Sequence, residues 1–209
     1  MIDTIAQIGA IQREVATRPA ESGEVVSVLL RRVYQASVED VWDALTDPDR
    51  IRRWFMPISG DLREGGDFQL EGNAGGRILR CEPPRLLRAT FGGDESFVEL
   101  RLAPDGDDGT ALELEHTVPL AFAGSGAGAL YVGPGWDGAF RALGLFLDGH
   151  VADDPVAAAS SSEAIEFSRQ SVDAWTDAIA GSGTAGPEEI AAAREASLAQ
   201  FAPDSGEPV

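Results

Sequence analysis

The sequence predicts an α+β protein in which amphipathic helices cover a curved antiparallel sheet. Three observations predict this class. Residues 24–55 hold an apolar strand followed by two short helical patterns, residues 61–118 change to a period of two, and residues 136–151 return to a helical period. Short helices with large apolar faces are not stable alone, so they must close over a concave surface, which we expect to be the sheet.

The first two helices have defined starting points. Ser37 and Asp40 have the spacing of a capping box, with Asp in place of the usual Glu or Gln, so a helix is expected to follow Ser37. The Asp-Pro pair at residues 47–48 has the form of an N-cap and a first helical residue. The second helix places Trp54 and Phe55 on its apolar side, toward the expected sheet.

Alternation of apolar and polar residues predicts the strands. They are expected around Phe68 and Leu70 and over residues 77–82, 86–91, 96–103 and 110–118. The segments between them are rich in glycine, proline and aspartate, which favour tight turns. Short strands at hairpin spacing are typical of an antiparallel meander.

The N-terminal segment and a glycine-rich stretch complete the pattern. Ile5, Ile8, Ile11 and Val15 have helical spacing, which predicts an N-terminal amphipathic helix. Residues 121–135 contain too much glycine for a regular element and are expected to form a mobile loop at the entrance of a cavity.

By composition and pattern the chain divides into four segments. These are the N-terminal helix over residues 1–23, a sheet domain over 24–151, a helical extension over 152–203 and a disordered tail over 204–209. The apolar stripes of the extension must be buried, so its helices either cover their own domain or pair two chains in a homodimer.

The composition excludes several classes of function. The chain has 209 residues and a formal net charge of −19, from 35 acidic and 16 basic side chains, all of the latter arginine. Nucleic-acid binding is not expected, because it needs clustered cations. No apolar run is long enough for membrane insertion, no signal peptide is visible, and Cys81 is a single cysteine, so we expect a cytoplasmic protein.

No metal or cofactor site is predicted. His116, His150 and Cys81 lack the spacing of a zinc site. The aspartates within residues 105–108 do not make a calcium loop, because His116 stands where the loop needs glutamate. The G-x-G-x-x-A pattern at residues 124–129 is followed by Gly-Pro-Gly rather than by an uninterrupted helix, as a dinucleotide site requires.

His116 is the titratable side chain of most interest. It shares the strand face of Leu112 and Leu114, so it is expected to point inward among apolar side chains. A buried histidine acts as a general base or ligand partner, or is a satisfied core residue. The aromatic residues also allow two interpretations, because their positions are compatible with a ligand cavity and with a solid core. Glu113 and Glu115 fall on the opposite face, where we expect them to be solvated.

Several segments together resemble a known family, the activator of heat-shock protein 90 ATPase homologue (AHSA-like) group of the START-like, or SRPBCC, superfamily. The matching segments are residues 31–57, 60–70, 78–91, 110–116 and the Gly-Trp pair at 135–136. The resemblance covers roughly residues 25–150. It implies the helix-grip fold, also called birch-pollen-allergen-like, in which a long C-terminal helix is gripped by a curved antiparallel sheet. The N-terminal segment and the FSRQSVDAW stretch resemble the actinobacterial type of this family.

The resemblance implies three kinds of function. Most of the superfamily binds hydrophobic small molecules, which predicts a non-catalytic binder without a cofactor. Some members are cyclases or hydrolases, in which case His116 is the candidate acid or base. The namesake stimulates a chaperone ATPase, which implies a module that binds a chaperone or regulator, here through an acidic surface without any lysine.

For the binder, we expect apolar side chains to supply most of the affinity and a few polar groups to orient the ligand. The expected lining is Trp54, Phe55, Phe68, Leu70, Ile78, Arg80, Phe91, Leu112, Leu114, His116, Tyr131, Trp136, Phe140 and Leu143.

Overall fold

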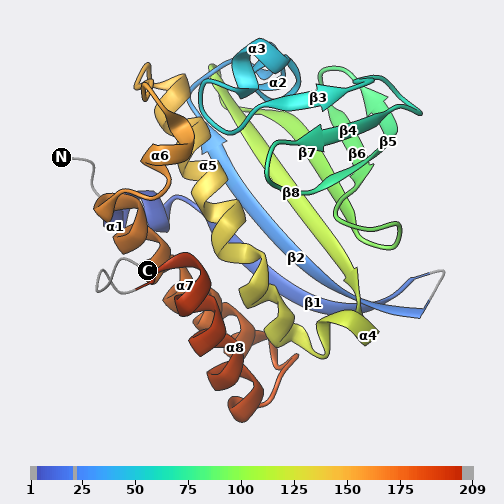
Figure 1. Ribbon diagram of the computed structural model, residues 1–209, viewed down its shortest axis with the longest axis vertical. Coiled ribbons are helices and arrows are strands. Elements are labelled where there is room, and N and C mark those ends of the chain that lie inside the picture. Colours follow the sequence, from blue (N-terminus) through green and yellow to red (C-terminus); the bar gives the residue numbers. More distant parts are fainter. Residues whose placement is uncertain (1–3, 21–22, 204–209) are drawn as a thin grey trace.

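An eight-stranded antiparallel sheet curves around one long helix (Figure 1). The order of its strands is β1-β2-β8-β7-β6-β5-β4-β3. The structure is a computed structural model that describes residues 4–20 and 23–203. The strands are β1 (Gln12–Ala20), β2 (Gly23–Tyr34), β3 (Ile58–Gly60), β4 (Asp67–Leu70), β5 (Gly75–Glu82), β6 (Leu86–Thr90), β7 (Phe97–Asp105) and β8 (Gly109–Pro119). This arrangement confirms the α+β, helix-grip fold expected from the sequence.

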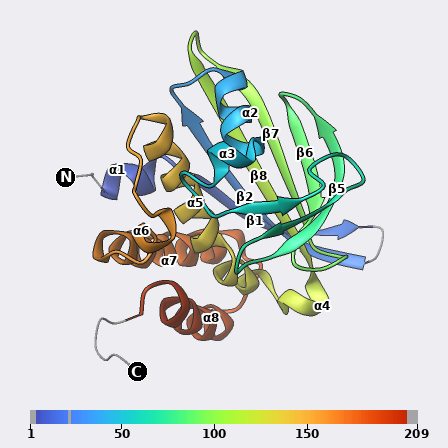
Figure 2. The same cartoon turned by 45° about the horizontal axis from the view of Figure 1, so that its top comes forward.

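The helices lie on one side of this sheet. They are α1 (Thr4–Gly9), α2 (Val38–Thr46), α3 (Pro48–Ile51), α4 (Leu120–Ala123), the 3-10 helix η1 (Gly126–Tyr131), α5 (Gly133–Leu147), α6 (Pro155–Ala158), α7 (Ser162–Ser182) and α8 (Pro187–Phe201). Figures 1 and 2 show α7 and α8 on the side of α5 that faces away from strands β3–β7. The C-terminal helices therefore pack against α5, and α7 also contacts the edge strand β1.

The expected starts of the first two helices are confirmed. The Ser37 hydroxyl accepts a hydrogen bond from the Asp40 amide at 3.2 Å, and the Asp47 carboxylate accepts one from the Asp49 amide at 2.8 Å. Each bond satisfies an amide that has no partner inside its helix. Both helices sit over one end of the sheet, where Trp54 follows α3 and donates from Nε1 to the Ala44 carbonyl oxygen at 2.9 Å.

The predicted N-terminal helix is wrong beyond residue 9. Residues 12–20 form β1, an edge strand paired with β2, so the sheet begins well before residue 24. Val15 is buried on the inward face of this strand, and Ile11, which lies just before the strand, is also buried. Two residues that are four apart lie on the same side of a strand as well as of a helix. The spacing of Ile11 and Val15 therefore did not distinguish a strand from a helix. Pro19 is accommodated because an edge strand leaves one row of amides unpaired.

The predicted mobile loop is also wrong. Residues 120–123 form α4 and residues 126–131 form η1, and α5 already begins at Gly133. Small residues allow η1 to pack tightly, since Ala129 and Leu130 are fully buried. The predicted tail over residues 204–209 lies outside the described residues.

Helix α5 is fixed to the sheet and to the C-terminal helices by buried polar contacts. The Tyr34 hydroxyl on β2 donates to the Phe140 carbonyl oxygen at 3.0 Å. On the other side of α5, Asp137 accepts hydrogen bonds from Arg13 of β1 and from Ser171 and Trp175 of α7. The helix is thus held at a defined height above the sheet, which is what a cavity beneath it requires.

The C-terminal helices form part of the core of the same chain. Phe167, Val172, Trp175 and Ile179 of α7 are almost completely buried and belong to one cluster with the sheet residues. Ser197 of α8 donates to the Leu130 carbonyl oxygen at 2.7 Å. The stripe of α7 is therefore covered by its own domain. A homodimer remains a prediction.

Two kinds of feature are absent from the described ranges. No helix there has the length and apolar character needed to cross a membrane, and no group of three His, Cys, Asp or Glu side chains there is arranged to hold a metal ion.

Candidate functional site

A cavity of about 150 Å³ lies between α5 and the concave face of the sheet. Eleven of the residues predicted to line it do so: Trp54, Phe55, Phe68, Leu70, Ile78, Phe91, Leu112, Leu114, Trp136, Phe140 and Leu143. Its lining residues are all hydrophobic. A space of this volume is large enough for a molecule of about the size of benzene.

The cavity follows from the periodicity of the elements around it. Trp136, Ala139, Phe140 and Leu143 stand at i, i+3, i+4 and i+7 of α5, so one face of the helix forms the roof. Alternate residues of β6, β7 and β8 form the floor. The two rings that follow α3 close one end, where those of Trp54 and Phe55 stack with centroids 5.3 Å apart.

Sequence reasoning missed eight lining residues. They are Leu45, Ile51, Ile58, Leu87, Ala89, Val98, Leu100 and Ala139. The signal was present for most of them, because Leu45 and Ile51 lie on apolar helix faces and the strand residues alternate with polar neighbours. The signal for Ala89 and Ala139 was weak, since a small side chain marks a cavity only when its large neighbours are known.

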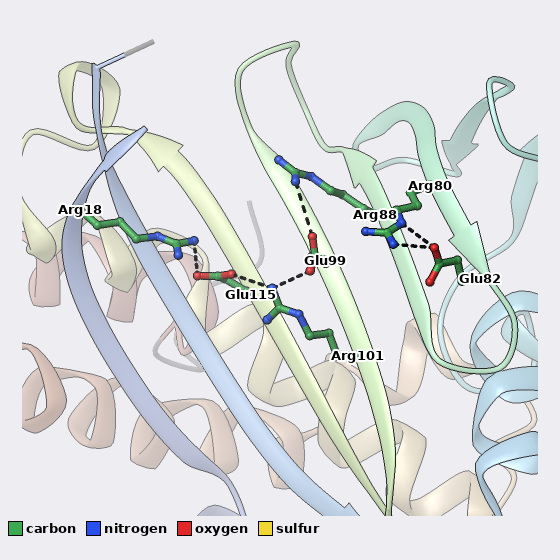
Figure 3. Close-up of polar contacts among 7 residues, drawn as sticks. All are labelled: Arg18, Arg80, Glu82, Arg88, Glu99, Arg101 and Glu115. Atoms are coloured by element: carbon green, nitrogen blue, oxygen red, sulfur yellow. Dashed lines mark hydrogen bonds and ion pairs between the residues drawn. The ribbon is translucent and has the colours of Figure 1, made fainter. Parts of the chain in front are cut away.

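Arg80 does not reach the cavity, which corrects the prediction. The pairing of β5 with β6 shifts register between Ile78 and Arg80, so Ile78 faces Ala89 inside while Arg80 pairs with Arg88 on the outer face. Because of this bulge, two residues that alternation places on one face lie on opposite faces. Figure 3 shows Arg80 beside Glu82 on that outer face, with a shortest separation of 2.6 Å between nitrogen and oxygen.

Tyr131 is also outside the cavity. It ends η1, and its side chain is 47% exposed. None of the residues in the predicted entrance loop, 121–135, lines the cavity. That prediction was wrong because the loop is helical and packs on α7 and α8 instead.

His116 is buried next to the cavity but is not part of its lining. Its side chain points inward as predicted, with 3% exposure. The Trp136 indole N–H donates to His116 Nδ1 at 3.0 Å, and Ser96 Oγ lies 2.9 Å from His116 Nε2. Since the indole is only a donor, Nδ1 must be the acceptor and Nε2 carries the proton. His116 thus holds Trp136 in place at the cavity wall.

This tautomer opposes catalysis by His116. A general base for Ser96 needs a free electron pair on Nε2, but Nε2 already carries its proton and donates toward Ser96. Burial lowers the pKa of His116 to about 4, so the ring is neutral at pH 7 and is a weak base. Both ring nitrogens of His116 have a hydrogen-bond partner, which is the arrangement of a satisfied core residue and not that of a general base.

The pH dependence of unfolding is expected to show the burial of His116. The pKa of His116 is about 4 in the folded protein and about 6.5 in the unfolded chain. Between these two pH values, the unfolded chain binds a proton at His116 and the folded chain does not. The stability that neutral His116 contributes is therefore complete above about pH 6.5 and is lost as the pH falls. The loss between pH 7 and pH 4.5 should be roughly 2 kcal/mol.

Urea unfolding of the wild type and of His116→Asn at both pH values measures this loss. Asparagine keeps an acceptor for Trp136 and does not titrate. Burial raises the pKa of Asp137 to about 6, which acts in the opposite direction, so the difference between the two proteins isolates His116. The same pH dependence in both proteins would contradict the assignment.

The outer face of the sheet carries a row of ion pairs, in contrast to the apolar inner face. Glu115 lies 2.5 Å from Arg18 and 3.5 Å from Arg101, and Arg101 also reaches Glu99 at 2.5 Å (Figure 3). Burial of Glu115 is outweighed by the Ser27 hydroxyl and the two arginines, so its pKa is lowered. Glu115 is therefore part of this network, not a freely solvated side chain as predicted.

The family described as Activator of Hsp90 ATPase homolog 1-like protein matches residues 35–147, which is more than half of the chain. The chain belongs to this family. The match begins just before α2 and ends with α5, so it includes every residue that lines the cavity.

Among solved structures, this AHSA1-like chain is similar to CalU16 from Micromonospora echinospora. The crystal structure of CalU16 is 43% identical, with a TM-score of 0.67, and the alignment covers 81% of this chain and 98% of that one. The solution structure of CalU16 gives 42% identity and a TM-score of 0.69 over 83% and 97% of the two chains. No curated protein matches.

A more distant structure shares the fold alone. The protein EF2215 from Enterococcus faecalis is 16% identical with a TM-score of 0.55, and the alignment covers 78% of this chain and 91% of that one. The sheet-and-helix architecture is thus retained at low sequence identity, which means that function has to be argued from the site.

Proposed function

We propose that this AHSA1-like chain is a non-catalytic binder of a small apolar or aromatic molecule, held between α5 and the sheet. The observation that carries the proposal is a cavity of about 150 Å³ with an entirely hydrophobic lining. Burial of apolar surface would supply the affinity, at about 25 cal/mol per Å². The hydrogen bonds of His116 support the non-catalytic part of the proposal, since they leave the ring no free acceptor.

The size of the cavity sets the class of ligand. Sites for drug-sized molecules usually have about 300–1,000 Å³, so the cavity fits one aromatic ring or a short branched chain. Aromatic side chains line both the roof and one end, and they favour a ring through offset or edge-to-face contacts. We therefore expect benzene, toluene and indole to bind, and charged analogues such as benzoate to be rejected for want of a polar partner.

Titration with benzene, followed by amide chemical shifts in NMR spectra, tests this proposal. Saturable shifts are expected around the cavity, and Ala89→Leu should abolish them, because its side chain fills the space beside Ile78 and Val98. Ala103→Leu is the matched control, since Ala103 is an exposed strand residue. Absence of saturable shifts in the wild type, or equal binding by Ala89→Leu, would refute the proposal.

A further inference from the structure

A second chamber of about 410 Å³ lies on the opposite side of α5 from the cavity. It is open to solvent on one side and is bordered by α5, α6, the first turns of α7, the end of α8 and the segment after α3. Most of this border comes from residues beyond 147, outside the part of the chain that the family match covers. Its volume is within the range of sites for drug-sized molecules, which the inner cavity does not reach.

The chamber exists because small residues occupy the outer face of α5. Gly135, Gly138 and Ala142 line it on that helix, at spacings of three and four residues. A Cβ atom added at Gly138 would meet no atom within 4 Å. A glycine inside a helix lowers stability by about 1 kcal/mol relative to alanine. At Gly138 no neighbouring atom is close enough to require a glycine. The open space above this face is therefore a feature that packing alone does not explain.

The charges of the chamber differ from those of the rest of the molecule. The chain has a net charge of −19, yet the described residues that line this chamber include Arg53 and Arg141 and no Asp or Glu. Arg53 is exposed and forms no ion pair within the described part of the chain. Its guanidinium lies 5.1 Å from the centre of the Phe146 ring. The chamber thus offers a positive charge without a counter-ion.

Arg141 adds a second, partly satisfied cation. Its Nη2 lies 2.6 Å from Glu163, but its Nε is buried and has no hydrogen-bond partner. The side chain is only 12% exposed, and its guanidinium lies over the Phe167 ring at 5.3 Å. A buried donor without a partner is costly, and an anion is the partner that satisfies a guanidinium best.

We infer that this chamber is a separate binding site for an organic anion with an apolar body, such as an aromatic or alkyl carboxylate or sulfonate. The anionic group pairs with Arg53 and Arg141. The apolar body lies against Phe55, Leu145, Ile165 and Phe201, which line the same chamber. Trp54, Phe55 and Ala139 line both spaces, so they form the wall between the anion site and the inner cavity. The inference does not depend on the function proposed for the inner cavity.

Fluorescence titration with anilinonaphthalene sulfonate tests the inference on the full chain. Saturable binding at one site is expected, and Gly138→Leu should abolish it, because the leucine enters the chamber from the middle of α5. Arg53→Gln should weaken it about tenfold, which corresponds to the loss of one charge-assisted contact. Phenylnaphthylamine, which has similar rings without the sulfonate, should bind more weakly and be unaffected by Arg53→Gln.

Two controls keep this test separate from that of the inner cavity. Ala89→Leu should abolish benzene binding and leave the binding of the sulfonate unchanged. Gly138→Leu should abolish the binding of the sulfonate and leave benzene binding unchanged. Circular dichroism and thermal unfolding confirm that each variant is folded. The inference is overturned if folded Gly138→Leu binds the sulfonate as tightly as the wild type, or if the sulfonate and the neutral probe bind equally well and Arg53→Gln changes neither.

Discussion

Replacing Asp137 with alanine is expected to lower the free energy of unfolding by about 3–5 kcal/mol, because it leaves a buried arginine without its counter-ion. Asp137 is completely buried, and the Arg13 side chain is only 8% exposed. One carboxylate oxygen accepts hydrogen bonds from Arg13 Nε at 2.8 Å, from Trp175 Nε1 at 3.1 Å and from the Ser171 hydroxyl. This oxygen therefore joins β1, α5 and α7, and its loss affects all three elements.

Urea unfolding at pH 7 measures this cost, with Asp148→Ala as the matched control. Asp148 is exposed at the end of the same helix, so its replacement should change the free energy of unfolding by less than about 0.5 kcal/mol. The double variant Arg13→Met with Asp137→Ala should recover part of the loss, because it removes both charges. A cost below about 1 kcal/mol for Asp137→Ala would show that the buried pair does not hold α5.

The second large effect is expected for Trp175→Ala, which should cost about 3–5 kcal/mol through loss of buried contacts and formation of a cavity. The Trp175 ring is fully buried in the core cluster. It packs so closely on the start of α5 that a Cβ atom at Gly133 would lie 2.4 Å from its Cε2 atom. Glycine at residue 133 is therefore needed for this contact.

The control for this prediction lies on the same helix. Asp177 is exposed on α7, and Asp177→Ala should remain within about 0.5 kcal/mol of the wild type. Calorimetric or urea unfolding should show one cooperative transition for each protein, because α7 belongs to the same core as the sheet. A Trp175→Ala protein as stable as the wild type would mean that the C-terminal helices contribute little to the fold.

The elements that were predicted well are those whose patterns fit a single period. Strands β7 and β8 alternate over five or more residues, and α2 and α5 have several apolar residues at helical spacing. The pattern around β1 fits both periods, because Ile11 and Val15 are four residues apart. What decides in favour of a strand is the pairing of β1 with β2, a tertiary contact that a local pattern does not contain.

The candidate site shows the same limit. Ile78 and Phe140 were correctly predicted to face the cavity because local alternation or helical spacing places them there. Arg80 was misplaced because a bulge reverses the alternation, and no glycine or proline between Ile78 and Arg80 announces it in the sequence. The outer chamber was not predicted, since it depends on how α6, α7 and α8 dock on α5.

His116 illustrates how contacts decide between two readings of one residue. Its burial was predictable from strand alternation, but its role depends on Trp136 and Ser96, which are each 20 residues away. The indole N–H fixes the tautomer, and the tautomer removes the acceptor that a general base needs.

The space under α5 is tested most directly by diffraction from crystals pressurised with xenon, which enters apolar cavities without needing any polar contact. We predict a xenon peak between α5 and the sheet, among the rings of Phe91, Trp136 and Phe140, and no such peak in Ala89→Leu. Wild-type crystals without a peak at this position would contradict the account, because they would show that the side chains under α5 leave no room for a ligand.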